Sequence, residues 1–379
     1  MKPVLWNTPN KGYTRVVMNR DYSCRSTLEV DTGAIKANVR TLAGLSDKCD
    51  LLGVVKANAY GLGTEIVVPA LLECGVKILG AATLSEAVEL LKYNVEVRIL
   101  SGLMPEEIAP AIELGITLPV IDYASACLID AEACRQKRKA TVQLAIDTGM
   151  GRVGIHFKTA RETIEKILAL ENLNVTGIYS HFPKAEEGDE DSLKQIGMMK
   201  ELAATFPLAQ YHLAASEGTL FFPEASRAPF NLIRLGIGMY GVLPGVNLQG
   251  SVKFKSRLAA VRRNPAGGSV SYGRLHKLAS ETLVGTVAAG YADGVPLHLT
   301  NKGFFRVNGK LCPILGRVTM DYTMICLDGV PEAQIGDEVE LFTSEAGDAI
   351  NIANWCNYKR THAWDILCGV SPRVKRVRK

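Results

Sequence analysis

A regular alternation of short apolar runs and helical segments fills the first two-thirds of the chain and constrains its fold more than any other feature. The runs are short, as is typical of strands buried on both faces of a parallel sheet. They lie at Leu51–Val55, Ile78–Ala82, Val97–Leu100, Thr117–Ile121, Val142–Ile146, Val175–Ser180, Tyr211–Ala215 and Leu232–Leu235. Eight such strands, each next to a helix, predict an α/β protein with a (β/α)8 TIM-type barrel.

Segments with helical spacing separate these runs. Ser85–Lys92 begins with a favourable cap residue, and Pro105–Leu114 opens with Pro-Glu-Glu. Thr159–Leu170 and Asp191–Ala204 have the same character. A doubly wound open sheet also alternates strands with helices, but it usually has fewer strands. No GxGxxG motif follows the first strand, so a dinucleotide-binding fold loses support.

The pattern changes after about Pro244, where helical periodicity almost vanishes. Strand-like runs follow at Leu283–Ala288, Phe304–Val307 and Glu338–Thr343. Asn308-Gly309 between β-rich runs is a strong hairpin signal. We therefore expect an N-terminal extension over residues 1–24, a barrel over residues 31–246 and a smaller, mostly β C-terminal domain over residues 247–379.

Charge and composition exclude several classes of function. The 379 residues include 43 basic and 39 acidic side chains, a balance that does not indicate nucleic-acid binding. No apolar run reaches the roughly 18–20 residues of a membrane-spanning helix, and the polar N-terminus lacks the apolar core of a signal peptide. Nine cysteines occur without CxxC or the Cys/His spacing of a zinc site. We expect a cytoplasmic protein with reduced thiols and no metal site.

Lys56 is the first candidate for chemistry, because functional residues of a barrel gather at the carboxyl ends of its strands. It directly follows the first predicted strand, within Val55-Lys56-Ala57-Asn58-Ala59-Tyr60-Gly61. In a partly desolvated barrel mouth, burial and nearby cations lower a lysine pKa and favour the free amine that forms a Schiff base. A lone loop lysine is more often simply exposed, so its neighbours must decide between these interpretations.

Polar and small residues follow the later strands. Arg152 ends Asp147-Thr148-Gly149-Met150-Gly151-Arg152 after strand five and suits a carboxylate. His181 follows strand six and Ser216 follows strand seven, while Arg234 and the small-residue turn at Gly236-Ile237-Gly238 mark strand eight, where barrels commonly bind phosphate. A lysine, a phosphate turn and ring-contacting groups at one rim together indicate a pyridoxal-phosphate site.

Two further residues stay ambiguous on pattern alone. His212, near the start of strand seven, is by itself more typical of a hydrogen-bonded core histidine than of a catalyst. Tyr291 lies between turn residues in Gly290-Tyr291-Ala292-Asp293-Gly294, and its spacing is equally consistent with a half-buried strand tyrosine.

From Arg25 onward the chain resembles the alanine racemases, pyridoxal-phosphate enzymes built from a barrel and a β domain. The resemblance rests on Val54–Gly61, Asp147–Gly154, Tyr179–Phe182, Arg234–Gly241, Val270–Gly273, Gly290–Gly294 and Gly316–Asp321. It implies a cytoplasmic homodimer that acts on a small amino acid and supplies D-alanine for the cell wall. It also implies that a strand over residues 26–30 joins the β domain.

The resemblance assigns a role to each candidate. Lys56 would hold pyridoxal 5'-phosphate through a C=N link and act as base on one face of the substrate, and the partner subunit's Tyr291 would act on the other face. Arg234 would face the ring nitrogen, which it cannot readily protonate. Other implied roles are cofactor binding by Tyr60, His181, Ser216, Gly236 and Ile237, substrate binding by Arg152 and Met320, and support by His212 and Asp321.

Four positions depart from the usual pattern of the family. Ala145 replaces a common lysine that braces the arginine of the DTGMGR motif, and Ala215 replaces the asparagine before the phosphate-binding serine. Leu62 replaces a common histidine, and Pro372 replaces a tyrosine that touches phosphate and limits substrate size. The Lys56–Tyr291 pair is present, but substrate preference stays open.

The leading hypothesis is therefore a racemase that interconverts L- and D-alanine. The loss of tyrosine bulk at Pro372 also allows a racemase of serine or another amino acid. A decarboxylase of the same fold is disfavoured by the GYADG and GRVTMD motifs. A non-catalytic pyridoxal-phosphate-binding protein is disfavoured by the second domain and Tyr291.

Overall fold

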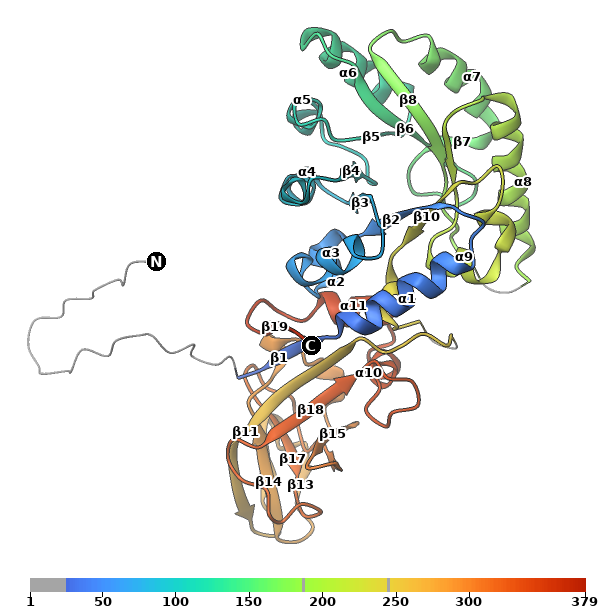
Figure 1. Ribbon diagram of the computed structural model, residues 1–379. Coiled ribbons are helices and arrows are strands. Elements are labelled where there is room, and N and C mark those ends of the chain that lie inside the picture. The colour runs from blue at the N-terminus through green and yellow to red at the C-terminus, as the bar shows by residue number, and fades with distance from the viewer. Residues whose placement is uncertain (1–24, 186–187, 244–245) are drawn as a thin grey trace, which may run out of the picture.

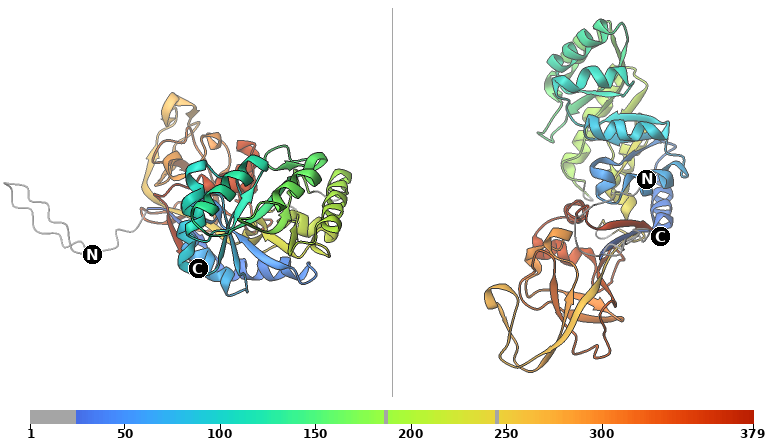
Figure 2. Two further views of the ribbon diagram at one scale, coloured as in Figure 1. Left: turned by 90° about the horizontal axis from the view of Figure 1, so that it is seen from above. Right: turned by 90° about the vertical axis from the view of Figure 1, so that its left-hand side faces the viewer.

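The computed structural model describes residues 25–185, 188–243 and 246–379. A strand-and-helix domain occupies one end of the molecule and a mainly β domain the other, with helix α1 (Thr32–Gly44) running between them (Figure 1; Figure 2 gives two further views). The expected extension over residues 1–24 lies outside the described residues.

The first domain is a closed ring of eight strands. Two parallel sheets, β10-β2-β3-β4 and β5-β6-β8-β9, make up the ring. Single parallel bridges at Arg98–Thr117 and Ala215–Arg234 join the sheets at both seams. The strands are β2 (Asp50–Val54), β3 (Ile78–Ala81), β4 (Glu96–Ile99), β5 (Leu118–Val120), β6 (Ala140–Asp147), β8 (Leu173–Tyr179), β9 (Gln210–His212) and β10 (Leu232–Leu235). The predicted (β/α)8 barrel is thereby confirmed.

Helices between the strands bury one apolar face each, as the sequence pattern predicts. They are α3 (Thr64–Leu72), α4 (Leu84–Leu90), α5 (Pro105–Glu113), α6 (Tyr123–Arg135), α7 (Phe157–Leu168), α8 (Glu190–Thr205) and the short α9 (Ser216–Phe221). One helix start was mispredicted. Thr83, rather than Ser85, caps α4, because its side chain accepts the backbone N–H of Glu86.

The second domain is built on an antiparallel sheet that also includes the start of the described chain. β1 (Thr27–Val30) pairs antiparallel with β11 (Val252–Asn264) and parallel with β19 (Lys375–Arg378). The sheet also contains β14 (Thr282–Val287), β15 (Phe304–Val307), β16 (Lys310–Pro313), β17 (Thr323–Cys326) and β18 (Glu338–Thr343). The hairpin predicted at Asn308-Gly309 is confirmed, since Val307 pairs with Lys310 across it.

The expected mostly β domain is confirmed, and it also contains two short helices that the sequence pattern did not reveal. α10 (Ile352–Lys359) and α11 (Ala363–Cys368) lie between β18 and β19. Both are too short for a 3.6-residue period to stand out in the sequence. The Asn351 side chain caps α10 through the backbone N–H of Ala353, and buried Trp355 anchors that helix in the core.

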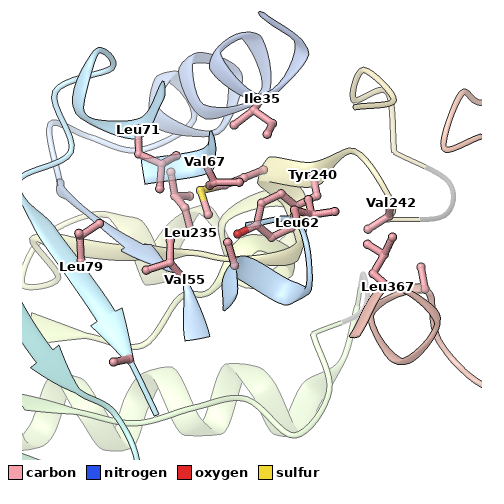
Figure 3. Packing of buried hydrophobic residues seen from close by; sticks show 14 of the residues in the cluster. Ile35, Val55, Leu62, Val67, Leu71, Leu79, Leu235, Tyr240, Val242 and Leu367 are labelled. Carbon is pink, nitrogen blue, oxygen red and sulfur yellow. The ribbon is translucent and has the colours of Figure 1, made fainter. Parts of the chain in front are cut away.

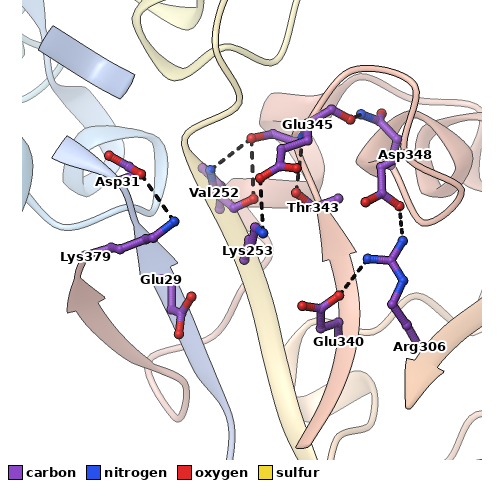
Figure 4. A network of polar contacts seen from close by, with 12 residues as sticks. Glu29, Asp31, Val252, Lys253, Arg306, Glu340, Thr343, Glu345, Asp348 and Lys379 are labelled. Atoms are coloured by element: carbon purple, nitrogen blue, oxygen red, sulfur yellow. Dashed lines mark hydrogen bonds and ion pairs between the residues drawn. The ribbon is translucent and has the colours of Figure 1, made fainter. Parts of the chain in front are cut away.

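The two domains share one apolar core and are also joined by polar contacts. Leu62 and Tyr240 of the barrel domain belong to the same buried cluster as Leu367 of α11 (Figure 3). At the chain's end, Lys379 forms an ion pair of 3.5 Å with Asp31, which also caps α1 (Figure 4). The same figure shows Arg306 bridging Glu340 and Asp348 within the β domain. These contacts hold the β domain in place against the barrel domain.

The surroundings of Gly61 show how closely the two domains pack. Its φ is +83°, and an added Cβ would lie 2.4 Å from the carbonyl oxygen of Leu367. Gly75 has a φ of +81° but open space around it. We expect Gly75→Ala to lower the free energy of unfolding by about 1 kcal/mol through backbone strain alone, and Gly61→Ala to lower it by about 3 kcal/mol, because overpacking is added. Denaturant titration measures the free energy of unfolding of both variants. Equal losses would show that the contact between Gly61 and Leu367 adjusts to a Cβ without cost.

Candidate active site

Most predicted residues meet at the carboxyl ends of the barrel strands. Lys56 follows β2, Arg152 follows β6, His181 follows β8, and Arg234 lies within β10. Arg234 Nη2 lies 3.3 Å from His181 Nδ1. The positive charges of Arg152 and Arg234 reach both Lys56 and His181. Residues far apart in the sequence thus form one cationic rim, which suits an anionic ligand.

A strained turn fixes the backbone behind Lys56. Ala57, Asn58, Ala59 and Tyr60 all have left-handed φ values between 51° and 56°, a conformation that costs roughly 1–2 kcal/mol for each residue with a Cβ. Glu86 compensates by accepting the backbone N–H of Ala57 on Oε1 and that of Ala82 on Oε2, each at 2.8 Å. This carboxylate therefore ties the ends of two neighbouring strands together beside Lys56.

Arg234 is buried, with 6% of its surface exposed, and is held by acceptors from two neighbouring strands and the loops after them. Nη2 donates to the carbonyl oxygens of Ser180 at 2.6 Å and Leu213 at 2.8 Å. Nη1 donates to His212 Nδ1 at 3.0 Å. Because an arginine can only donate, His212 Nδ1 must be the acceptor and its proton must sit on Nε2. His212 is thus the buried, hydrogen-bonded histidine that its pattern suggested, and it braces Arg234.

Besides Glu86, two further supporting residues were missed by the sequence analysis. Gln143 Oε1 accepts the Nε2–H of His212 at 3.0 Å, which fixes the tautomer. The Tyr179 ring stacks on His212 with centroids 5.1 Å apart, and the Arg234 guanidinium lies over the same ring at 5.6 Å. The available signal for Gln143 was a polar residue inside an apolar strand, since such a side chain must find partners within the barrel.

The electrostatics of the site follow from burial among cations. Burial, then the charges of Arg234 and Arg152, lower the pKa of His181 to about 3. Burial chiefly lowers the pKa of His212 far below its usual range. Burial and Arg152 lower the pKa of the Lys56 amine, against the opposing charge of Glu86. Arg234 has a pKa lowered by burial to about 10 and is still a cation at neutral pH.

Hydroxyl and backbone donors gather beside this rim. The backbone N–H groups of Gly236 and Gly238 donate to Ser216 Oγ at 3.1 Å and 3.0 Å. A Cβ on Gly236 would lie 3.1 Å from the Tyr60 hydroxyl oxygen, so only a glycine leaves that approach open. Ile237 begins a 3-10 turn (Ile237–Tyr240) with its N-terminus at the same place. This donor-rich cradle is suited to a phosphate group.

Tyr291 and Met320 lie in the β domain and are largely exposed, at 44% and 53%. Their segments contact each other, because the Tyr291 N–H donates to the Thr319 carbonyl at 2.9 Å. Asp321 accepts a hydrogen bond from Arg373 at 2.8 Å. No side-chain hydrogen bond ties Tyr291 to its own barrel within the described ranges. The single chain therefore assembles one half of the predicted site and presents the other half outward.

The four departures have plain structural settings. Ala145 is buried in β6, and Leu62 is fully buried in the shared core. Ala215 precedes α9 and provides no side-chain cap. Pro372 stands beside Arg373, which reaches the carboxylates of Asp293 and Asp321. Among the residues that the structure describes, no group of three or more His, Cys, Asp or Glu could hold a metal ion, and no helix could span a membrane.

Comparison with known proteins agrees with this architecture. Residues 30–244 match the family model "Alanine racemase, N-terminal domain", and residues 251–378 match "Alanine racemase, C-terminal domain". The chain belongs to the alanine racemase family. The resemblance inferred from the motifs is thus confirmed.

Individual relatives cover almost the whole chain. Alanine racemase 2 of Caldanaerobacter subterraneus is 33% identical over 92% of this chain and 94% of its own length. The alanine racemase of Streptomyces lavendulae has a TM-score of 0.87 and 33% identity, over 94% of this chain and 97% of that one. The Bartonella henselae alanine racemase, solved with covalently bound pyridoxal phosphate, has a TM-score of 0.86 and 28% identity, over 94% of this chain and all of that one.

The neutral histidines predict a loss of stability in acid. Unfolding returns His181 and His212 to a pKa near 6.5, so the unfolded chain binds protons that the folded chain refuses. The contribution of these two histidines to the free energy of unfolding is therefore fully present above about pH 6.5 and decreases as the pH falls. For His181 the decrease continues toward about pH 3. We expect each histidine to remove about 1 kcal/mol of unfolding free energy between pH 7.5 and 5.5. Denaturant titration should show a shallower pH dependence for His212→Asn, and a flat wild-type profile would contradict the neutral imidazoles.

Proposed function

We propose that this chain is a pyridoxal-phosphate-dependent racemase that interconverts L- and D-alanine. The observation that carries the proposal is the convergence of Lys56, His181 and Arg234 beside the cradle of Ser216 and Gly236. Membership of the alanine racemase family supports the same reaction. Pyridoxal phosphate, when bound, supplies an electron-withdrawing ring that stabilises negative charge at the Cα of an attached amino acid.

The residues present fit this cofactor. Donors from Tyr60, Ser216, Gly236 and Ile237 would hold the phosphate, and the lowered pKa of Lys56 provides the amine for the covalent link. Both Nη atoms of Arg234 are already bonded to protein acceptors, whereas its Nε has no partner among the described residues. Nε would donate to the ring nitrogen, and a guanidinium with a pKa of about 10 would leave that nitrogen unprotonated. His181 would lie against the ring as a neutral imidazole.

Racemisation requires a proton to leave one face of Cα and another to arrive on the opposite face. Lys56 is the base that the barrel provides on one face. Tyr291 is the base for the other face, and its exposure in the single chain is explained if it serves a second subunit. We therefore infer a head-to-tail homodimer in which Tyr291, Met320 and Asp321 complete the partner's barrel.

The substrate carboxylate would bind Arg152 at the rim and the Met320 backbone from the partner subunit. His212 and Asp321 would act as supporting residues, on Arg234 and on the Tyr291 segment respectively. We place the activity in the cytoplasm, where it would supply D-alanine for the cell wall. The free state of Cys49, Cys74, Cys127, Cys134, Cys312, Cys326, Cys356 and Cys368 supports that compartment.

The proline at position 372 favours a second candidate function, a racemase of serine or a larger amino acid. A proline in place of a tyrosine removes bulk and a hydroxyl close to the proposed substrate path. The ratio of kcat/KM for alanine and serine decides between them. A higher kcat/KM for serine would replace alanine as the substrate without changing the proposed site.

Two inactive variants should restore each other. We expect Lys56→Ala to abolish racemisation, and borohydride to trap the cofactor on Lys56 of the wild type but not on that variant. Tyr291→Phe should lower kcat by at least about 100-fold, in line with the loss of a general base. If sites are shared, mixed dimers of the two variants carry one complete site and regain up to half of wild-type activity. Circular dichroism of L- and D-alanine mixtures measures the rates.

Tyr123→Phe is a matched control, because Tyr123 is exposed to 41% on a barrel helix and has no place in the proposed site. It should keep wild-type activity. Failure of the mixed dimer to regain activity would refute the shared site, whereas trapping on a different lysine would refute the cofactor assignment.

A further inference from the structure

The segment that carries Tyr291 is fixed by backbone hydrogen bonds, although the tyrosine side chain itself is 44% exposed. We propose that Arg373 is a positioning residue that aligns Tyr291 and Met320 for catalysis in the partner's site. This inference rests on the proposed function, and it assigns to Arg373 an effect on the neighbouring subunit rather than on its own.

The two presented segments form one unit. Tyr291 N–H donates to the Thr319 carbonyl at 2.9 Å, and Ala292 N–H donates to the Met320 carbonyl at 3.0 Å. A Cβ on Gly290 would lie 2.2 Å from the Thr319 oxygen, so the backbones touch without spare room. A shift of the loop that carries Met320 must therefore move Tyr291 as well.

Arg373 holds this unit through two carboxylates. Its Nη2 donates to Asp321 Oδ1 at 2.8 Å, and its Nε lies 3.5 Å from Asp293 Oδ1. Asp293 is buried, with 6% of its surface exposed, and its Oδ2 accepts the backbone N–H of Gly290 at 2.9 Å. One planar guanidinium thus joins the loop after Met320 to the turn that begins just before Tyr291, a geometry that a lysine cannot reproduce.

The energetics separate positioning from stability. Arg373 is half exposed, with 49% of its side chain accessible, so its ion pairs contribute little to the folding free energy. Removing it leaves Asp293 and Asp321 unpaired at the root of the Tyr291 turn, where their like charges repel. A misplacement of about 1 Å can slow a reaction roughly 100-fold. The expected defect is therefore larger in catalysis than in folding.

Loss of Arg373 could instead act on the barrel of its own chain, through the neighbouring Arg376. Arg376, three residues further on, donates to the carbonyl oxygens of Gly61, Val370 and Ser371. Gly61 ends the turn behind Lys56, so damage to the segment over residues 370–376 could instead disturb the barrel of its own chain. An effect of Arg373 on the partner's site and an effect on its own barrel predict opposite outcomes in a dimer of two different variants.

The test uses differently tagged chains, one with Arg373→Met and the other with Lys56→Ala, purified as the mixed dimer with cofactor bound. One of its sites combines the Lys56 of the first chain with a Tyr291 held by the intact Arg373 of the second. We expect the Arg373→Met homodimer to lose 10- to 100-fold in kcat. We expect the mixed dimer to match a mixed dimer of wild type and Lys56→Ala. A mixed dimer as slow as the Arg373→Met homodimer would overturn the inference.

The isotope effect gives a readout that a general structural defect would not move. Slower proton transfer at Tyr291 should raise the primary deuterium effect of α-deuterated alanine for one enantiomer and leave the other near its wild-type value. Arg263→Met is the matched control, since Arg263 is an exposed arginine of the same domain paired with Glu281, and it should change neither kcat nor the isotope effect. An equal rise for both enantiomers would overturn the proposed role.

The mixed dimer of Lys56→Ala and Tyr291→Phe separates this inference from the proposed function. If that dimer stays inactive, the shared site itself fails, and the role of Arg373 across the interface fails with it. If that dimer is active while the Arg373→Met mixed dimer stays slow, only the role of Arg373 is overturned.

Discussion

A buried guanidinium organises the barrel end of this molecule. A charge withdrawn from water needs hydrogen-bond acceptors, and both Nη atoms of Arg234 find them in His212 and the carbonyls of Ser180 and Leu213. The backbone of Arg234 also pairs with that of Ala215 in the β-bridge that closes one seam of the ring. The same side chain therefore joins strands and fixes the tautomer of His212. After burial, its charge is also the next cause of the lowered pKa of His181 and His212.

A cationic rim limits the ligands and the chemistry that the barrel can support. Burial, Arg152 and Arg234 together lower the pKa of the Lys56 amine. The same positive charges favour anionic ligands such as a phosphate and a carboxylate. The strained turn at Ala57–Tyr60 keeps that amine in place, with Glu86 holding the backbone behind it. The second domain presents an exposed tyrosine on a turn that backbone hydrogen bonds tie to the Thr319–Met320 segment.

The sequence predicted the barrel because each strand is a short run buried on both faces, a pattern that few architectures repeat eight times. It predicted Lys56, His181 and Arg234 because barrel strands end at one rim. It did not predict α10 and α11, which are too short to show a period. It also missed Gln143 and Glu86, since their value lies in partners that are distant in the chain and close only after folding.

By itself, the sequence determined the order of the barrel strands, the residue types at each strand end and the family to which the motifs belong. Those properties depend on local periodicity and on spacing along the chain. Only the tertiary structure decided that His212 braces Arg234, that four residues after Lys56 adopt left-handed geometry, and that Arg373 joins two turns. Each of these depends on the meeting of groups from separate segments, and the free energy of such contacts is defined only once the chain has closed around them.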